Sequence, residues 1–301
     1  MPQFPGNSSV NHGSSSQIDH SFGIVGGYSI RRFFGKLPKF HQCHLGEARL
    51  TALARTDLGA DGSYGGGNHD GLSQTNKRPI ILVHGITNTA GTFTPQRNYF
   101  KSNGWTDETV YATTYGAGPA VNVINVKMEC GFVQQIRNMI EAVYQFTGQK
   151  VDVIGYSLGS PIARKAIMGG ICVDNVNVDL GGPLTNKVET YVSVAGANRG
   201  SGTCILPLFN ACNLNNGLYC SSSFLQNINP SAPGSQHYEG NYVFSIYGPS
   251  DDKVKWSNNC GTRNSQILGA DDERDNIPGN HDTILTSTVA MQKTLLDTHA
   301  F

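Results

Sequence analysis

An unbroken apolar run at Ile80–Val83, bounded by Pro79 and Gly85, most constrains what this chain can fold into. A strand that is buried on both faces has such a run, as in the middle of a parallel sheet. Four more segments have the composition of strands: 109–115, 151–156, 188–195 and 242–247. Apolar residues at helical spacing predict helices at 132–143, 161–168 and 286–296. Because strands alternate with helices, the sequence predicts an α/β fold with a mostly parallel sheet that is covered on both faces.

The chain is expected to form a tail and one domain. Residues 1–25 are rich in Ser, Asn, Gly and His, which predicts a flexible N-terminal tail, and residues 26–301 are expected to form a single domain. The 22 Lys and Arg residues balance 22 Asp and Glu, so no net charge favours a nucleic-acid partner. No apolar stretch has the length of a transmembrane helix. Residues 1–22 lack the pattern of a secretory signal peptide.

Seven cysteines leave at least one thiol outside any intramolecular set of disulfides. They are Cys43, Cys130, Cys172, Cys204, Cys212, Cys220 and Cys260. No Cys-x-x-Cys pair occurs, which argues against a zinc ribbon or thioredoxin-like redox chemistry. Three of the cysteines lie in a loop rich in Asn, Ser and Gly at 196–235, where disulfides are more useful than buried thiols. This pattern favours an oxidising compartment.

The segment Gly155-Tyr156-Ser157-Leu158-Gly159 lies where the strand predicted at 151–156 gives way to a helix. A sharp turn at this place leaves no room for side chains at the flanking glycine positions, and it holds the serine above the carboxyl edge of the sheet. Open α/β sheets bind their ligands at that edge. The sequence therefore predicts that Ser157 is a nucleophile.

A serine nucleophile needs a base, and an acid that orients the base. Three histidines follow Ser157 in the chain, and His281 is predicted to lie in a loop just before the last helix, where the base is expected. The strand predicted at 242–247 is followed by Asp251 and Asp252. Either carboxylate is placed to orient the imidazole, and the sequence pattern alone leaves the choice between them open.

Acyl transfer also needs two backbone amides that point at the developing oxyanion. One is expected from Leu158, directly after the nucleophile, and the other from Ile86, in the loop after the strand at 80–83. His84 precedes this loop and follows a buried strand, so a structural hydrogen-bonding role is favoured for it over a catalytic one. This chemistry requires no metal and no organic cofactor.

Taken together, these motifs resemble the class 2 lipases, small α/β-hydrolases related to minimal bacterial lipases and to extracellular polyhydroxybutyrate depolymerases. The residues that carry the resemblance are Val83-His84-Gly85-Ile86, Gly155-Tyr156-Ser157-Leu158-Gly159, and Ser245-Ile246-Tyr247 followed by Asp251. Further segments are similar to secreted nematode lipases of this class: 65–69, 113–116, 164–167 and 169–172. The similarity covers most of the chain, from about residue 40 to residue 297.

The resemblance implies an α/β-hydrolase catalytic domain at 26–301 that acts as a serine carboxylic-ester hydrolase, foremost a triacylglycerol lipase. It places the nucleophile on Ser157, the base on His281, the acid on Asp251 rather than Asp252, and the oxyanion donors on Ile86 and Leu158. The implied partner is a lipid or other ester, including one at a lipid–water interface. No cofactor, nucleic acid or transmembrane segment is implied, and we expect a monomer.

Secreted members of the family contain disulfides, so the resemblance strengthens the expectation that the protein is extracellular. It makes a bridge between Cys130 and Cys172 plausible, and Cys43 is then the candidate for the unpaired cysteine. The segment at 198–240 is longer than in the minimal bacterial lipases. Its apolar residues suit either a mobile lid and acyl-chain wall or simple packing of the loop against the domain, and packing is the favoured reading.

Two alternative functions are compatible with the same residues. A short-chain carboxylesterase or polyester depolymerase has the same catalytic residues and differs in its substrate. A catalytically silent binding protein on a hydrolase scaffold is expected to lack part of the triad, and here Ser157, Asp251 and His281 are all present.

Overall fold

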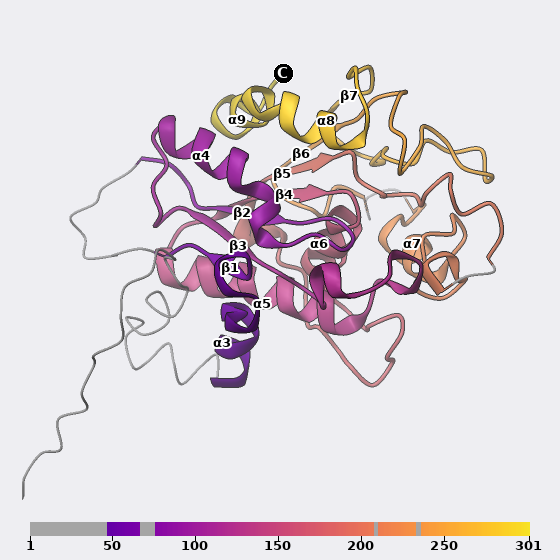
Figure 1. Cartoon of the computed structure of the whole chain (residues 1–301), viewed down its shortest axis with the longest axis horizontal. Coiled ribbons are helices and arrows are strands. Elements are labelled where there is room, and N and C mark those ends of the chain that lie inside the picture. Colours follow the sequence, from indigo (N-terminus) through magenta and orange to yellow (C-terminus); the bar gives the residue numbers. More distant parts are fainter. Residues whose placement is uncertain (1–46, 67–75, 208–209, 233–235) are drawn as a thin grey trace, which may run out of the picture.

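A seven-stranded, mostly parallel sheet forms the centre of the protein (Figure 1). The computed structural model describes residues 47–66, 76–207, 210–232 and 236–301. In spatial order the strands are β1 (Ser63–Tyr64), β3 (Val110–Thr113), β2 (Ile80–Val83), β4 (Val151–Tyr156), β5 (Val188–Val194), β6 (Tyr242–Ile246) and β7 (Asp272–Arg274). Only β1 is antiparallel to its neighbour, so the carboxyl ends of the other strands lie along one edge.

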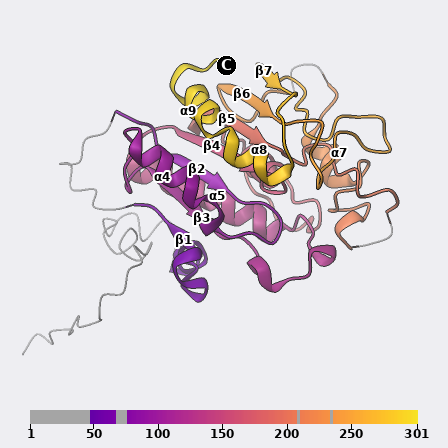
Figure 2. The ribbon, with the colours of Figure 1, turned by 45° about the horizontal axis from the view of Figure 1, so that its top comes forward.

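Helices cover both faces of this sheet (Figures 1 and 2). One face packs on α3 (Glu47–Ala54), α5 (Cys130–Thr147), α6 (Gly159–Met168) and α7 (Ser223–Ile228). The opposite face packs on α4 (Thr94–Ser102), α8 (His281–Ser287) and α9 (Val289–Thr298). Short 3₁₀ helices occur in the loops: η1 (Thr56–Asp61), η2 (Ala90–Phe93), η3 (Gly118–Ala120), η4 (Val123–Asn125), η5 (Thr185–Lys187) and η6 (Asn210–Cys212). The predicted α/β-hydrolase arrangement, a parallel sheet covered on both faces, is confirmed.

The five predicted strands are present with shifts of at most two residues at their ends, but two edge strands were missed. The sequence around β7 is a charged run in which no strand was predicted, whereas Asp272–Arg274 pairs with β6 at the edge of the sheet. An edge strand with solvent on one side does not need an apolar run. For this reason hydrophobicity alone does not indicate β7.

The predicted last helix begins earlier than expected and is divided in two. The side chain of Asn280 accepts a hydrogen bond from the amide of Thr283 at 2.9 Å, which caps the start of α8. His281 is therefore the first residue of a helix, and the prediction that it lies in a loop is wrong. The chain passes through Thr288 between α8 and α9.

Six cysteines form three disulfides: Cys130–Cys172, Cys204–Cys212 and Cys220–Cys260. The bridge expected between Cys130 and Cys172 is thus present. The seventh cysteine, Cys43, and the predicted tail at 1–25 lie outside the described residues. None of the helices in the described parts of the chain has the length and hydrophobicity needed to cross a membrane.

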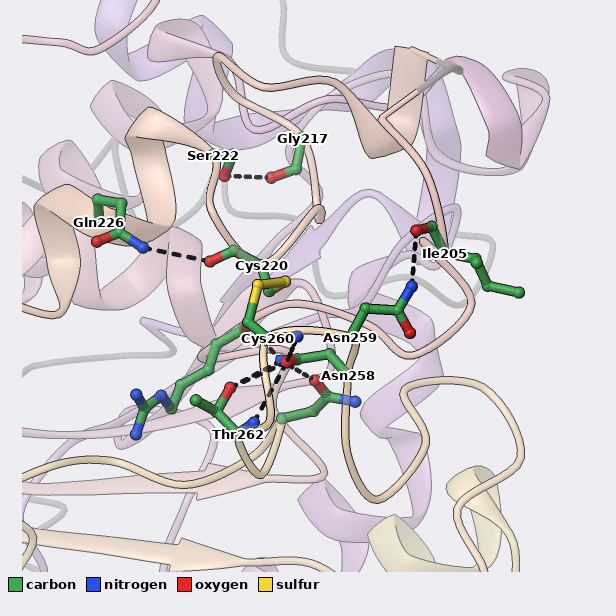
Figure 3. Close-up of a disulfide and its surroundings, with 11 residues drawn as sticks. Ile205, Gly217, Cys220, Ser222, Gln226, Asn258, Asn259, Cys260 and Thr262 are labelled. Carbon is green, nitrogen blue, oxygen red and sulfur yellow. Dashed lines mark hydrogen bonds between the residues drawn. A yellow bond between two sulfur atoms is a disulfide. The ribbon is translucent and has the colours of Figure 1, made fainter.

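The segment at 198–240 is fastened to the domain at several places. Phe224, Leu225 and Ile228 of α7 are buried in the core below the sheet. Figure 3 shows the Cys220–Cys260 disulfide, which joins the segment to the loop after β6, and the side chain of Asn259 donating to the carbonyl of Ile205 at 2.7 Å. Much of the segment therefore packs against the domain. By contrast, Ile205, Leu206 and Leu214 are more than half exposed, and Leu208 and Phe209 lie outside the described residues.

Candidate active site

Ser157 lies in a strained turn between β4 and α6. Its φ is 55°, in the left-handed region that side chains other than glycine rarely adopt. A Cβ atom at Gly159 would lie 2.3 Å from the carbonyl oxygens of both Val83 and His84, and one at Gly155 would lie 2.7 Å from the Cα of Ser160. Both glycines are therefore required by close backbone packing. The turn fixes Ser157 at the carboxyl edge of the sheet, as the motif predicts.

His281 and Asp251 form a buried hydrogen-bonded pair. The His281 Nδ1 lies 2.7 Å from Oδ2 of Asp251, and each side chain is 2% exposed. The other oxygen of Asp251 accepts hydrogen bonds from the amides of Lys253 and Val254, both at 2.9 Å. The carboxylate is thus held by the loop after β6, and its bond to Nδ1 leaves Nε2 as the ring nitrogen for proton transfer.

Asp252 has a different place from Asp251, although the residue pattern alone left the two equivalent and only the resemblance favoured Asp251. Its Oδ1 accepts a hydrogen bond from the backbone amide of His281 at 3.0 Å, and that bond lowers the pKa of the exposed Asp252 carboxyl. Of the two aspartates, Asp251 contacts the imidazole ring and Asp252 contacts the main chain at the start of α8.

A cleft of about 550 Å³ opens beside these residues. Ser157 and His281 both line it, together with Ile86 and Leu158, the residues predicted to supply the oxyanion donors. Within the described part of the chain, the amides of Ile86 and Leu158 donate to no other protein group. A Cβ at Gly85 would lie 2.9 Å from the Cβ of Ser157, so glycine permits the loop after β2 to approach Ser157.

His84 has hydrogen-bond partners on both sides of its buried ring. Its Nε2 accepts from the amide of Tyr115 at 3.0 Å, so Nδ1 carries the proton and donates to the carbonyl of Gly85 at 2.8 Å. The ring stacks on Tyr115 with centroids 4.1 Å apart. Burial lowers the pKa of His84 to about 4, with a smaller contribution from the positive charge of Arg55. The imidazole is neutral and supports the loop after β2, in agreement with the structural role expected for it.

Sequence reasoning gave Tyr156 no role, yet it contacts the imidazole. Its ring centroid lies 4.9 Å from that of His281, and its hydroxyl donates to Oδ1 of Asp282 at 2.7 Å. Lys253 also binds the Asp282 carboxylate, with its Nζ 2.8 Å from each oxygen. Burial raises the pKa of the Tyr156 hydroxyl, and the bond to Asp282 raises it further. In the sequence, the contact between Tyr156 and Asp282 was indicated only by their positions: Tyr156 directly precedes Ser157, and Asp282 directly follows His281.

Two further residues that sequence reasoning missed line the cleft from η4, namely Val123 and Ile124. Other lining residues are Ala197 and, from the segment at 198–240, Ser201, Thr203, Cys204, Ala211, Cys212 and Leu218. The cleft is therefore lined by both apolar and polar side chains. Among the residues that the structure describes, no group of three or more His, Cys, Asp and Glu side chains is arranged to hold a metal ion.

Residues 77–294 match the model of the family described as Lipase (class 2). The chain belongs to the class 2 lipase family. The match spans the sheet from β2 onward and includes the turn at Ser157 (the elbow), the loop after β2 and the His281–Asp251 pair. Membership in this family supports a lipolytic hydrolase that acts on carboxylic esters.

Solved lipase structures have a similar fold. The mature lipase BlEst2 from Bacillus licheniformis is 15% identical, with a TM-score of 0.52 over 73% of this chain and 92% of that one. The propeptide form of the same lipase has a TM-score of 0.56 at 15% identity, over 79% of this chain and 53% of that longer chain. A structure reported for the metagenome-derived lipolytic enzymes LipS and LipT is 11% identical, with a TM-score of 0.50 over 75% of this chain and 95% of that one. At these identities the likeness concerns the fold.

Proposed function

We propose that the protein is a serine carboxylic-ester hydrolase, foremost a triacylglycerol lipase, in which Ser157, His281 and Asp251 form the catalytic triad. The observation that carries the proposal is the buried bond between His281 Nδ1 and Asp251, beside a cleft that also holds the strained Ser157. A buried acid on one ring nitrogen fixes the tautomer that lets the other nitrogen accept a proton.

In the first half of the reaction, Ser157 Oγ attacks the ester carbonyl carbon while its proton passes to Nε2 of His281. The carbonyl π electrons move onto oxygen, where the amides of Ile86 and Leu158 stabilise the negative charge. Asp251 stabilises the imidazolium. The tetrahedral intermediate then collapses: the bond to the alcohol oxygen breaks, His281 gives that oxygen its proton, and the acyl group remains on Ser157.

In the second half, water replaces the alcohol. His281 takes a proton from the water, and the water oxygen adds to the acyl carbon. The bond between the acyl carbon and Ser157 Oγ then breaks as His281 returns the proton to Oγ. The products are a carboxylic acid and the regenerated serine. Every proton transfer in this cycle uses one imidazole and needs no metal ion or redox cofactor.

The Ser157→Ala variant tests the proposal, with Ser250→Ala as its matched control because Ser250 is an exposed serine next to the acid loop. We expect Ser157→Ala to lose nearly all hydrolysis of p-nitrophenyl esters, and Ser250→Ala to keep it. Organophosphonate labelling of the wild type should modify Ser157, as mapped by peptide mass spectrometry. Substantial turnover of the esters by the purified Ser157→Ala protein contradicts the triad. A wild type that neither reacts with the organophosphonate nor hydrolyses the esters indicates a catalytically silent binding protein.

Apolar side chains around the cleft support action on water-insoluble lipid. Val123 and Ile124 line the cleft and are about half exposed, and Ile205 and Leu206 are exposed in the loop closed by the Cys204–Cys212 disulfide. An exposed apolar patch beside a site is typical of contact with lipid. Comparing the rates on emulsified triacylglycerol and on dissolved esters of the same chain length distinguishes a lipase from a carboxylesterase or polyester depolymerase.

We also propose that the protein works outside the cell or in a luminal compartment. Three disulfides in a domain of this size are typical of oxidising environments. Expression in a eukaryotic host from the protein's own gene, followed by assay of the medium and the cell fraction, tests this proposal. Retention of the enzyme in a reduced intracellular form overturns it.

A further inference from the structure

We propose that the fully buried Asn198 is a positioning residue for the oxyanion hole, and that it acts through its neighbour Ala197 on the amide of Leu158. This inference rests on the proposed ester hydrolysis at Ser157, in which the Leu158 amide is one of the two oxyanion donors. Asn198 does not line the cleft, so it acts by holding the main chain and not by contact with the substrate.

The carbonyl oxygen of Ser157 accepts two hydrogen bonds from main-chain amides. The donors are Ser160 and Ala197, each at 3.1 Å. This carbonyl and the N–H of Leu158 belong to the same peptide group. Because a trans peptide is planar and its C=O and N–H point in opposite directions, the two bonds that fix the carbonyl also fix the direction of the Leu158 N–H.

The other proposed oxyanion donor is fixed in the same way. The carbonyl of Gly85 belongs to the peptide group that contains the N–H of Ile86. It accepts a hydrogen bond from Nδ1 of His84 at 2.8 Å and one from the amide of Asn88 at 3.2 Å. Each oxyanion amide is thus directed by two hydrogen bonds to the carbonyl of its own peptide group.

The segment that carries Ala197 folds back onto α6 directly after β5. Ala195 has a φ of 46°, in the left-handed region, which turns the chain at the end of β5. A Cβ at Gly196 would lie 2.2 Å from Oγ of Ser193 and 2.7 Å from Cβ of Ser160, so the segment packs directly on the first turn of α6. This packing places the segment, and hydrogen bonds are needed to fix its orientation.

The side chain of Asn198 supplies three such hydrogen bonds. The carbonyl of Ser265 can only accept, so the Nδ2 group of Asn198 faces it, at 2.8 Å. Nδ2 also donates to Oγ of Ser193 at 2.8 Å, and Oδ1 accepts from the hydroxyl of Ser160 at 2.7 Å. The residue directly after Ala197 is therefore joined to β5, to α6 and to the loop after β6.

The polar character of this buried cluster favours a positioning role over simple packing. Asn198, Ser160 and Ser193 are all 0% exposed. Apolar side chains of similar size would fill the same space without needing hydrogen-bond partners. Hydrogen bonds depend on direction, whereas apolar contacts do not. The cluster therefore fixes the orientation of the segment, and with it the bond from the Ala197 amide to the Ser157 carbonyl.

The experiment compares Asn198→Ala and Ser160→Ala, which remove one hydrogen bond from its two ends, in the hydrolysis of a dissolved p-nitrophenyl ester. We expect kcat to fall about tenfold in each variant while KM changes less than about twofold. An oxyanion donor acts on the transition state, and its complete removal typically costs about a hundredfold or more, so misdirecting it should cost less.

A transition-state analogue gives a second readout. An alkyl trifluoromethyl ketone forms a tetrahedral adduct with a serine, and its oxygen then carries the negative charge of the intermediate. Its inhibition constant should rise by about the same factor as kcat/KM falls. A residue that only stabilises the fold would lower the melting temperature and leave the inhibition constant unchanged.

Gln135→Ala is the matched control, with all variants assayed well below their melting temperatures. The side-chain amide of Gln135, in α5, also makes three hydrogen bonds, to the carbonyls of Ala52 and Thr114 and to the hydroxyl of Thr113, each at 3.0 Å. Gln135 does not line the cleft. Its substitution should lower the melting temperature and keep the kcat and the inhibition constant of the wild type.

Two outcomes overturn the positioning role: an unchanged kcat and inhibition constant in Asn198→Ala and Ser160→Ala, or an equal loss of kcat in Gln135→Ala. If Asn198→Ala does not fold, the result for Ser160→Ala decides alone. Continued hydrolysis by Ser157→Ala instead overturns the proposed function, and that result does not depend on Asn198.

Discussion

The hydroxyl of Tyr156 donates to the carboxylate of Asp282 at 2.7 Å, and this bond holds the tyrosine ring beside the imidazole of His281. The two residues adjoin the proposed nucleophile and base in sequence, one directly before Ser157 and the other directly after His281. The hydrogen bond therefore connects the elbow of β4 with the first turn of α8.

We expect Tyr156→Phe to lower kcat about fivefold with little change in KM, because the variant keeps the ring and loses a hydrogen bond worth about 1 kcal/mol. Asp282→Asn keeps an acceptor for the tyrosine and should lose less. Steady-state kinetics of both variants, with thermal melting as a check on folding, measure the effect. A rise in KM with an unchanged kcat would indicate a role in substrate binding instead.

The two adjacent aspartates should differ sharply in their effect on turnover. Asp251→Asn removes the charge that faces the imidazolium and favours the wrong tautomer, so kcat should fall on the order of ten-thousand-fold. Asp252→Asn keeps an oxygen for the His281 amide and should lower kcat less than about tenfold. Equal losses in the two variants would contradict the assignment of Asp251 as the acid.

Two Gly→Ala substitutions should have opposite effects on stability. At Gly159 the new methyl would lie 2.3 Å from two carbonyl oxygens, so Gly159→Ala should lower the free energy of unfolding by about 3 kcal/mol and disrupt the elbow. At Gly131, in the first turn of α5, nothing lies within 4 Å of the added methyl. Gly131→Ala should therefore stabilise the protein by about 0.5 kcal/mol. Urea unfolding of both variants tests the prediction.

His84 should make the protein less stable in acid. Burial lowers its pKa from the usual 6.5 to about 4, so in the folded state it binds fewer protons than in the unfolded state between these values. Its contribution to stability is complete above pH 6.5 and is lost as the pH falls toward 4. NMR titration of the His84 ring should show a neutral Nδ1–H imidazole at pH 5.5. A ring that becomes protonated near pH 6.5 would disprove the prediction.

The disulfides should differ in their resistance to a thiol reductant. Cys130 and Cys172 are both buried, whereas Cys260 is exposed in its bridge to Cys220. Since exchange requires the attacking thiolate to reach a sulfur atom, mild reduction should open Cys220–Cys260 before Cys130–Cys172. Alkylation and peptide mass mapping over time give the order. Loss of a disulfide of this kind typically costs about 2–4 kcal/mol of stability.

The parts of the fold that could be predicted are those with a local cause. Ile80–Val83 is buried on both faces, and an uninterrupted apolar run indicates this burial. Val151–Tyr156 is also fully buried, and apart from Asp152 it consists of residues typical of a buried strand and the glycine of the motif. The turn at Ser157 needs glycine at 155 and 159 for reasons that lie within a few residues. By contrast, β7 at the edge of the sheet has no such run, and the start of α8 depends on a cap by Asn280.

The parts of the site that could not be predicted depend on contacts between distant segments. Asp251 and Asp252 are neighbours with the same side chain, so the residue pattern alone left the choice open and only the resemblance placed the acid on Asp251. The path of the loop after β6 brings Asp251 to the ring and Asp252 to the amide of His281. Val123 and Ile124 come to the cleft on a short 3₁₀ helix without any periodic pattern. Tyr156 meets Asp282 across 126 positions of sequence.

The wall of the cleft and the loop that carries Asp251 are fastened to each other. The amide of Gly202 donates to the carbonyl of Val254 at 2.9 Å, the hydroxyl of Ser201 donates to the carbonyl of Lys253 at 3.1 Å, and Cys220 is bridged to Cys260. A protein engineer who remodels the segment at 198–240 to admit a bulkier ester will therefore also displace the loop that orients the proposed base. Substitutions on this side of the cleft that widen the range of substrates should therefore also lower the turnover number, and directed evolution there should show this relation repeatedly.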